Sequence, residues 1–286
     1  MDLTLTSRAL RRGRPGHTTM NIVVCVKHVP DATADRRFES DNTVDRVGVD
    51  GLLSELDEYA VEQALQIKEK SDDPAETKVI ALCVGPEKAV DAVRKALQMG
   101  ADEGIHVSDE AIAGSDYVAT SLVLAKAVSK VGEDRSVDLV VCGMASTDAS
   151  GSVVPAMLAE RLDLPQVTFA SVVETQGDQV RIKRDGDTAT EVIGGTMPLV
   201  LSVTDQTGEA RYPSFKGIMA AKKKPLETWS LSDLGVEAGD VGLSVAWTQV
   251  EDTTERPPRT AGEIVKDEDG SGATALTEFL ASKKFI

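Results

Sequence analysis

The chain has 286 residues, 41% hydrophobic and only 3% aromatic, a composition that fills a core and favours a layered α/β fold over an aromatic-rich sandwich. Its 47 acidic residues outnumber its 31 basic ones and give a net charge of −16, which argues against nucleic-acid binding because that needs an excess of Lys and Arg. No apolar run approaches the ~18 residues of a membrane-spanning helix, so no membrane insertion is expected.

The first nineteen residues differ from the rest because they are rich in Arg and contain one acid, Asp2. This composition is compatible with a transit peptide. It also fits a disordered tail or an upstream start codon, with Met20 as the true first residue. We favour this second interpretation and predict a disordered extension over residues 1–19.

Strand and helix patterns alternate through the first half of the chain. The predicted strands are 21–29 ("NIVVCVKHV"), 79–84 and 137–142. The predicted helices are 54–70, 86–99 and 115–131, the last two ending at Gly100 and Gly132. Ser54 and Asp57 have the spacing of a capping box. The alternation predicts βαβ crossovers and a parallel sheet covered on both faces.

In such a sheet ligands bind beyond the carboxyl ends of the strands, where connections diverge. This rule selects the loops after Lys27, at Gly85 and after Gly143. The last loop is rich in small and hydroxyl residues and leads to a predicted helix at 153–162, whose first N–H groups could receive a phosphate. Because neither G-x-G-x-x-G nor G-K-[ST] is present, the loop could equally be a capped connection, and both interpretations stay open.

The second half of the chain has a different texture. After Pro165, short runs separated by turn residues predict an antiparallel meander, and "MPLVLSVTD" predicts a buried strand that returns to the main sheet. From about Val250 the chain is loop-like and ends in a short amphipathic helix. The apolar residues of that helix region are Leu276, Phe279, Leu280 and Ile286. This arm could pack on its own domain or wrap a partner subunit.

Residues suited to catalysis are scarce. Beyond the first nineteen residues the only histidines are His28 and His106, and neither is flanked by a nucleophile or a metal-binding set. Asp31, Asp35 and Asp57 are expected on the solvated surface of so acidic a chain. We therefore predict no catalytic residue and no metal site.

The three cysteines, Cys25, Cys83 and Cys142, lie at or near the ends of apolar runs and lack metal-ligand spacing. We expect them to be reduced core residues, which fits a reducing compartment such as the cytoplasm. Without catalytic side chains of its own, the chain would need a borrowed cofactor to handle electrons.

Six sequence blocks from about Met20 to Ile286 resemble the β subunit of electron transfer flavoproteins, the FixA-like small subunit in its actinobacterial form. The blocks are "NIVVCVKHVPD", "LDEYAVEQALQIKEK", "GPEKAVDAVRKALQMGAD", "STDASGSVVPAMLAERLDLPQVTFAS", "ARYPSFKGIMAAKKK" and "PPRTAG". The resemblance implies an α/β fold of the adenine nucleotide alpha hydrolase-like kind: a mostly parallel twisted sheet with helices on both faces, plus a small antiparallel meander. It places the nucleotide-binding domain at 20–249 and a C-terminal arm that packs on the α subunit at 250–286.

The resemblance also implies an electron carrier rather than an enzyme. In the family an α/β heterodimer takes electrons from acyl-CoA and other flavin dehydrogenases, as in fatty acid β-oxidation, and passes them to electron transfer flavoprotein-quinone oxidoreductase. The α subunit mainly holds the FAD, and the β subunit binds a structural AMP. Electron-bifurcating relatives hold a second FAD in place of AMP. Outside the family, the alternative is an adenine-nucleotide-binding protein of the stress type.

Carried over residue by residue, the resemblance places the nucleotide pocket at the strand-end loops. Its residues are Cys25, Ser54, Glu55, Leu56, Asp57, Val84, Met144, Ala145, Ser146, Thr147, Asp148, Ala149, Ser150, Gly151, Ser152, Val153 and Val154. Many members have a loop rich in Gln, Ala and Asp that ends in Gln-Thr-Gly, whereas this chain has Ala-Ser-Thr-Asp and then Ser-Val-Val-Pro. Asp148 is retained but amide donors are lost, so the choice between AMP and FAD stays open. Leu56 and the 31–32 turn match the family's edge near the α-subunit flavin.

The basic segment 211–224 matches the family's recognition loop, in which an exposed apolar anchor, here Phe215, inserts into the dehydrogenase. The residues assigned to docking are Tyr212, Phe215, Lys216, Ile218, Met219, Lys222 and Lys223. The lysines up to Lys224 would steer the segment toward acidic partner surfaces. Without the resemblance, the residues themselves leave another possibility, that Phe215, Ile218 and Met219 pack inward.

Overall fold

A computed structural model describes residues 20–33, 36–254, 257, 261–262, 264–267 and 269–286. The predicted extension at 1–19 and Asp35 lie outside the described residues. The chain divides into two units, 1–251 and 252–286. Each unit is described by itself.

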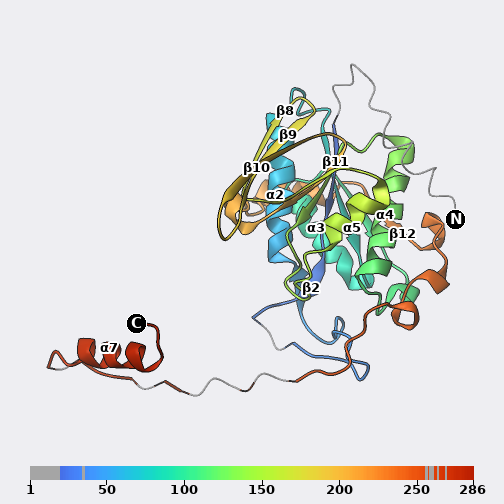
Figure 1. Cartoon of the computed structure of the whole chain (residues 1–286). Coiled ribbons are helices and arrows are strands. Elements are labelled where there is room, and N and C mark those ends of the chain that lie inside the picture. Colours follow the sequence, from blue (N-terminus) through green and yellow to red (C-terminus); the bar gives the residue numbers. More distant parts are fainter. Residues whose placement is uncertain (1–19, 34–35, 255–256, 258–260, 263, 268) are drawn as a thin grey trace. The chain divides into compact units, whose positions relative to one another are not determined.

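Seven parallel strands form the central sheet of the first unit, in the order β12-β5-β4-β1-β6-β11-β7 (Figure 1). Their bounds are β1 Asn21–Cys25, β4 Lys78–Val84, β5 Glu103–Val107, β6 Leu139–Gly143, β7 Gln166–Ala170, β11 Leu199–Val203 and β12 Leu226–Trp229. β1, β6 and β11 are buried along their whole length, as near-continuous aliphatic runs predict for strands covered on both faces. The predicted fold class is confirmed.

Helices cover both faces of this sheet. They are α2 Glu55–Lys70, α3 Val90–Met99, α4 Tyr117–Asp134, α5 Val154–Leu162 and the short α6 Phe215–Ala221. Alternate residues of β1 separate the two cores: Ile22 and Val24 belong to the cluster formed with α2 and α3, whereas Val23 and Cys25 belong to the cluster formed with α4 and α5. The part of the sheet around β1 is therefore packed tightly on both faces.

Three element boundaries differ from the prediction. The run 21–29 forms two strands, because the chain leaves the sheet after Cys25 and continues as β2 His28–Pro30, paired with β3 Gly51–Leu53. α4 continues through Gly132 to Asp134, since one glycine inside a helix costs only about 1 kcal/mol. Residues 166–170, expected in the meander, instead form an edge strand of the main sheet.

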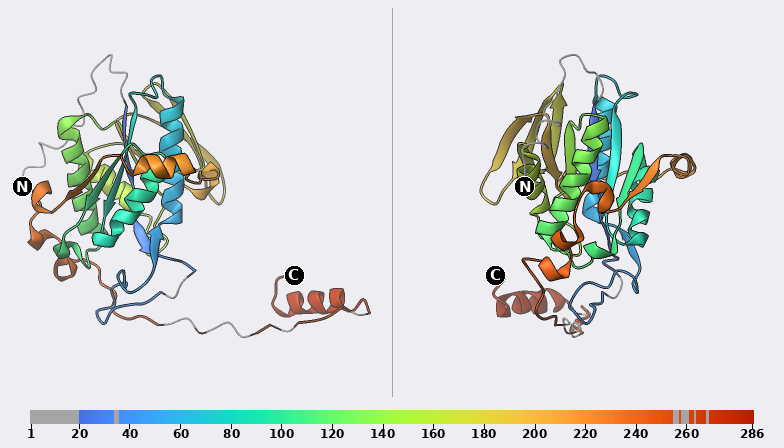
Figure 2. Two further views of the ribbon diagram at one scale, coloured as in Figure 1. Left: turned by 180° about the vertical axis from the view of Figure 1, so that it is seen from behind. Right: turned by 90° about the vertical axis from the view of Figure 1, so that its right-hand side faces the viewer.

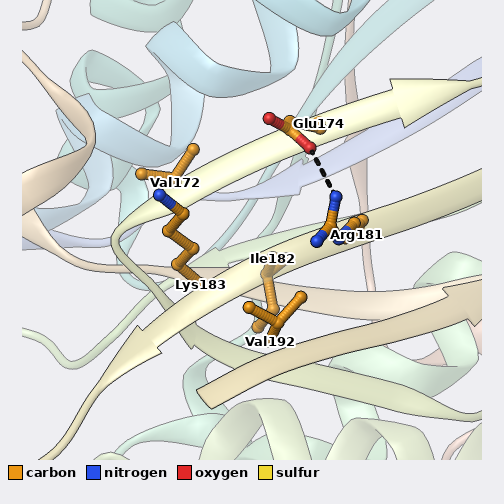
Figure 3. A pocket seen from close by; sticks show the side chains of 6 residues that line it. All are labelled: Val172, Glu174, Arg181, Ile182, Lys183 and Val192. Atoms are coloured by element: carbon orange, nitrogen blue, oxygen red, sulfur yellow. Dashed lines mark ion pairs between the residues drawn. The ribbon is translucent and has the colours of Figure 1, made fainter. Parts of the chain in front are cut away.

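The antiparallel meander consists of β8 Val172–Gln176, β9 Gln179–Asp185 and β10 Thr190–Thr196. Val180 and Ile182 of β9 are buried in the core shared with α2 and α3. On this sheet a small hollow is lined by Val172, Glu174, Arg181, Ile182, Lys183 and Val192, with an Arg181–Glu174 ion pair at 3.7 Å (Figure 3). It lies apart from the carboxyl ends of the parallel strands.

The second unit contains one helix, α7 Gly272–Ser282, in its described part. None of its residues is buried, and Leu276 and Phe279 are exposed. Ile286, expected with the helix, lies beyond its end and is exposed as well. Among the described residues of the whole chain, no helix has the length and apolar character needed to cross a membrane.

Candidate functional site

The carboxyl ends of β1 and β6 mark the point where the chain reverses its progress across the sheet. From β1 the chain builds β4 and β5 on one side and then crosses back to β6 on the other side. Connections therefore diverge between β1 and β6, the position at which such sheets bind ligands. Two segments meet there, the start of α2 and residues 144–153 after β6.

Asp57, in the first turn of α2, is buried between these two strand ends. Its carboxylate accepts a hydrogen bond from the backbone N–H of Lys27 at 2.8 Å, and its other oxygen lies beside Gly143. A Cβ at Gly143 would lie 2.7 Å from Asp57 Oδ1 and 2.8 Å from the carbonyl oxygen of Leu56, so this close approach requires glycine. Burial raises the pKa of Asp57 to about 7, although the hydrogen bond and charge of Lys27 favour the carboxylate.

Two expectations for this corner are wrong. The Ser54 hydroxyl does not cap α2 but accepts the N–H of Thr147 at 3.3 Å, so no capping box forms. Asp57 is not on the surface, because its carboxylate binds the backbone N–H of Lys27 after β1 instead of capping its own helix. Spacing identifies the side chains at a helix start, but it does not reveal which distant backbone N–H groups arrive beside them. Asp31 does lie at the surface, where it binds Thr33.

Asp148 lies in the β6 loop, residues 144–153, and binds two basic side chains from other segments. Its side chain is 2% exposed and accepts from Lys27 Nζ at 2.9 Å and from an Arg46 Nη at 2.7 Å. Burial raises the pKa of Asp148, but the charges of Lys27 and Arg46 outweigh burial and hold the pKa below its ordinary value. Burial lowers the pKa of Lys27. The three side chains fix the β6 loop against β1.

Two arginines from residues 36–48 reach this loop and were not predicted from the sequence. Arg36 donates to the carbonyl oxygen of Thr147 at 3.1 Å, and Arg46 binds Asp148. In the same segment Asn42 donates to the carbonyl oxygens of Val250 and Glu251. Residues 36–48 lack helical or strand periodicity, so no sequence signal located them beside the loop.

The rest of the β6 loop has an unusual backbone. Ser150 and Ser152 adopt φ angles of +52° and +56°, in the left-handed region that glycine favours. A Cβ at Gly151 would lie 2.2 Å from the Tyr117 ring, and the Tyr117 hydroxyl donates to the carbonyl oxygen of Ala149. α5 then begins at Val154 without a side-chain cap. No side chain at the N-cap therefore accepts a hydrogen bond from the first N–H groups of α5.

The other residues assigned to the pocket lie around these contacts. Cys25 ends β1, and its thiol, together with burial, raises the pKa of Cys142 on the neighbouring strand β6. Val84 ends β4, next to β1 in the sheet, and Glu55 opens α2. The remaining assigned residues, Met144, Ala145, Ser146, Ala149, Ser152 and Val153, belong to the β6 loop itself.

The cysteines are core residues, as expected, and the two described histidines lie in the core as well. Cys25, Cys83 and Cys142 are buried and unpaired by disulfides, and burial raises the pKa of the Cys83 thiol to about 12. His28 and His106 are also buried, and burial lowers the pKa of each imidazole. In the described part of the chain no group of three His, Cys, Asp or Glu side chains could hold a metal ion.

The segment 211–224 presents apolar side chains to solvent. Tyr212 is 92% exposed, Phe215 81%, Met219 48% and Ile218 37%. The possibility that Phe215, Ile218 and Met219 pack inward is therefore wrong. The basic residues Lys216, Lys222 and Lys223 are exposed beside them. Lys224 differs from its neighbours, because it is half-buried and bonds to backbone carbonyl oxygens.

Comparison with known proteins places this architecture in one family. The model of the electron transfer flavoprotein domain matches residues 41–234. Electron transfer flavoprotein subunit beta of Mycobacterium tuberculosis is 43% identical over 93% of this chain and 99% of its own length. The protein of the same name from Megasphaera elsdenii is 31% identical over 93% and 100%.

A third relative belongs to a differently named assembly. The caffeyl-CoA reductase-Etf complex subunit CarD of Acetobacterium woodii is 34% identical over 86% of this chain and 92% of its own length. Family model and relatives agree with the resemblance found in the sequence. The chain belongs to the electron transfer flavoprotein family, as a β subunit.

Proposed function

We propose that this chain carries out its role in a heterodimer with an electron transfer flavoprotein α subunit. The heterodimer accepts electrons from acyl-CoA and other flavin dehydrogenases, as in fatty acid β-oxidation, and passes them to electron transfer flavoprotein-quinone oxidoreductase. The chain binds AMP at the carboxyl ends of β1 and β6 and docks dehydrogenases through segment 211–224. The observation that carries this proposal is the exposure of Phe215, 81%, within a basic segment of a protein with net charge −16.

An adenine nucleotide fits the chemistry at the carboxyl ends of β1 and β6. The start of α5 offers N–H groups without a side-chain cap, and such groups favour a phosphate because the helix dipole is positive there. The hydroxyls of Ser150 and Ser152 lie in the same loop. Lys27 and Arg46 supply two positive charges against the single carboxylate of Asp148. AMP would therefore be held by residues 144–154, with a structural role.

Electron chemistry comes from FAD, which the α subunit mainly holds. This chain contributes shape and charge around that partner. The exposed apolar residues Leu276 and Phe279 of α7 suit a helix that covers a partner surface, and we assign the arm 250–286 to the α subunit. The buried, unpaired cysteines suit a reducing compartment, and we assign the protein to the cytoplasm.

Docking by segment 211–224 follows the physics of interface hot spots. A buried aromatic anchor carries much of the binding free energy, while surrounding charges set the encounter rate. Phe215 supplies the anchor, and Lys216, Lys222 and Lys223 supply the charges. The expected partner is a flavin dehydrogenase that has an apolar pocket bordered by carboxylates.

The test uses the heterodimer purified from co-expressed subunits. It is mixed, without oxygen, with an acyl-CoA dehydrogenase and that enzyme's acyl-CoA substrate, and the flavin absorbance is followed. We expect the flavin of the heterodimer to be reduced within seconds. A flavin that stays oxidised in this mixture, but is reduced by dithionite, contradicts the proposal.

A further inference from the structure

Segment 211–224 is fixed to the body of the protein at its first residue. The Arg211 guanidinium bonds to the Glu62 carboxylate at 2.6 and 3.0 Å and to the Glu69 carboxylate at 2.6 and 3.1 Å. The backbone N–H of Arg211 also donates to Glu62, at 3.1 Å. Both carboxylates come from α2, so one arginine joins the segment to two turns of this helix.

The inner carboxylate of this contact is shielded from water. The Glu62 side chain is 8% exposed, whereas that of Glu69 is 54% exposed. Burial raises the pKa of Glu62, but hydrogen bonds from Arg211 and Gln66 outweigh burial and keep the pKa below its ordinary value. A guanidinium that binds carboxylates with two parallel bonds fixes direction as well as distance. Arg211 therefore sets the path of the backbone that leads into α6.

The far end of the segment is fixed to α3. Lys224 Nζ donates to the carbonyl oxygens of Leu97, at 2.9 Å, and Ala101, at 2.5 Å. Between the two ends, a Cβ at Gly217 would lie 2.6 Å from the carbonyl oxygen of Gln98, so α6 rests directly on the last turn of α3. The left view of Figure 2 shows α6, in orange, beside α3.

The two fixed ends explain how Tyr212 and Phe215 remain in solvent. Apolar side chains on a free loop would gain free energy by collapsing onto nearby apolar surface. Here the backbone on both sides is held by charged contacts, which leaves the rings facing outward. We infer that Arg211, through Glu62 and Glu69, and Lys224 are positioning residues that hold α6 in the orientation that docks a flavin dehydrogenase.

This inference rests on the proposed function and assigns a role to residues that do not themselves reach the partner's pocket. A segment held in its bound form loses little conformational entropy on docking, whereas a loose segment must be ordered by the partner. Loss of the Arg211 contact should therefore raise the KM for the heterodimer as electron acceptor. It should leave kcat unchanged, because the docked complex is the same.

The experiment measures reduction of the purified heterodimer by an acyl-CoA dehydrogenase, supplied with its acyl-CoA substrate, as the heterodimer concentration is varied. Arg211→Gln should raise the KM about tenfold and Glu69→Gln about fivefold, on the scale of lost preorganisation. Arg211→Gln leaves the buried Glu62 without its arginine and could destabilise the protein. Glu69 is half exposed, so Glu69→Gln should fold in either case. The double variant should be no worse than Arg211→Gln alone.

The matched control is Arg135→Gln. Arg135 pairs with Glu103 at 2.9 Å and is 36% exposed, close to the 33% of Arg211, but this pair joins the residue that follows α4 to the start of β5. Its KM should equal that of the wild type. Arg211→Lys should raise the KM less than Arg211→Gln does, but should not restore the wild-type value, because an ammonium group cannot bridge two carboxylates as a guanidinium does. Amide hydrogen exchange of residues 211–224 should be faster in Arg211→Gln even without partner.

Phe215→Ala, measured in the same assay, separates this inference from the proposed function. If Phe215→Ala raises the KM but Glu69→Gln and Arg211→Gln do not, the positioning role is wrong and docking through the segment stands. If Phe215→Ala also leaves the KM unchanged, docking through the segment is wrong. Unchanged hydrogen exchange in Arg211→Gln contradicts the positioning role as well.

Discussion

The carboxylate of Asp57 accepts a hydrogen bond from the backbone N–H of Lys27 at 2.8 Å, although the two residues lie 30 positions apart. The other oxygen of the same carboxylate lies beside Gly143, at the end of the neighbouring strand β6. One buried acid therefore joins the two strand ends between which the nucleotide is proposed to bind. Its protonation state bears on the stability of the whole corner.

Asp57 should make the stability of the protein depend on pH. Its pKa rises from the ordinary 3.8 to about 7 on folding, so the folded protein holds a proton that the unfolded chain releases. The proton on Asp57 therefore contributes about 4 kcal/mol to the free energy of unfolding below pH ~4. This contribution is lost as the pH rises to ~7. Asp57→Asn removes this dependence.

Thermal unfolding of the wild-type and Asp57→Asn heterodimers between pH 4.5 and 8 measures this pH dependence of stability. We expect the stability advantage of the wild type over Asp57→Asn to shrink as the pH rises and then to level off above pH ~7. A difference in Tm that stays constant over this range would show that Asp57 does not take up its proton in the folded state.

Gly143→Ala tests the close packing of the same corner. The new Cβ would lie 2.8 Å from the carbonyl oxygen of Leu56, which is backbone and cannot move away cheaply. We expect a loss of about 1–3 kcal/mol in unfolding free energy. Gly239→Ala is the control, because a Cβ there meets open space. Equal stability of the two variants in urea unfolding would refute the packing at Gly143.

The Asp148 contacts should hold the nucleotide loop. Asp148→Asn leaves Lys27 and Arg46 without their shared carboxylate, and we expect a loss of about 2–3 kcal/mol in stability together with most of the bound AMP. Arg46→Gln should cost less, because Lys27 keeps its partner. Nucleotide content after gel filtration gives the readout, and full AMP occupancy in Asp148→Asn would speak against the assignment.

The architecture was predictable because it depends on patterns within each segment. Aliphatic runs at 79–84 and 137–142 gave the strands, and the rule for parallel sheets then selected the loops after Lys27 and Gly143. The surroundings of Asp57 were not predictable, because its spacing from Ser54 suits a capping box and nothing nearby in sequence shows that Lys27 and Gly143 lie beside it.

Arg46 and Arg211 show the same limit. Each pairs with a carboxylate far away in the chain, Asp148 in one case and Glu62 in the other. Charge and composition describe such residues only as solvated surface. The outward orientation of Phe215 also could not be obtained from apolarity, which by itself favours burial; the motif match suggested it, and the contacts of Arg211 account for it.

Phe215→Ala should weaken docking without changing the cofactor. Loss of an aromatic anchor costs about 2 kcal/mol or more, which corresponds to roughly a thirtyfold higher KM for the heterodimer with an acyl-CoA dehydrogenase. Flavin content should stay the same. Val192→Ala, at an apolar side chain that is 52% exposed on the small sheet, is the control. Equal KM values for wild type and Phe215→Ala would remove the docking role.

The most direct test of the account is to denature the co-expressed heterodimer and quantify the released nucleotides by chromatography. We predict one FAD and one AMP per heterodimer, with the AMP held by residues 144–154 of this chain. Two FAD and no AMP would contradict the structural role of this nucleotide site and would make the carboxyl ends of β1 and β6 a redox centre.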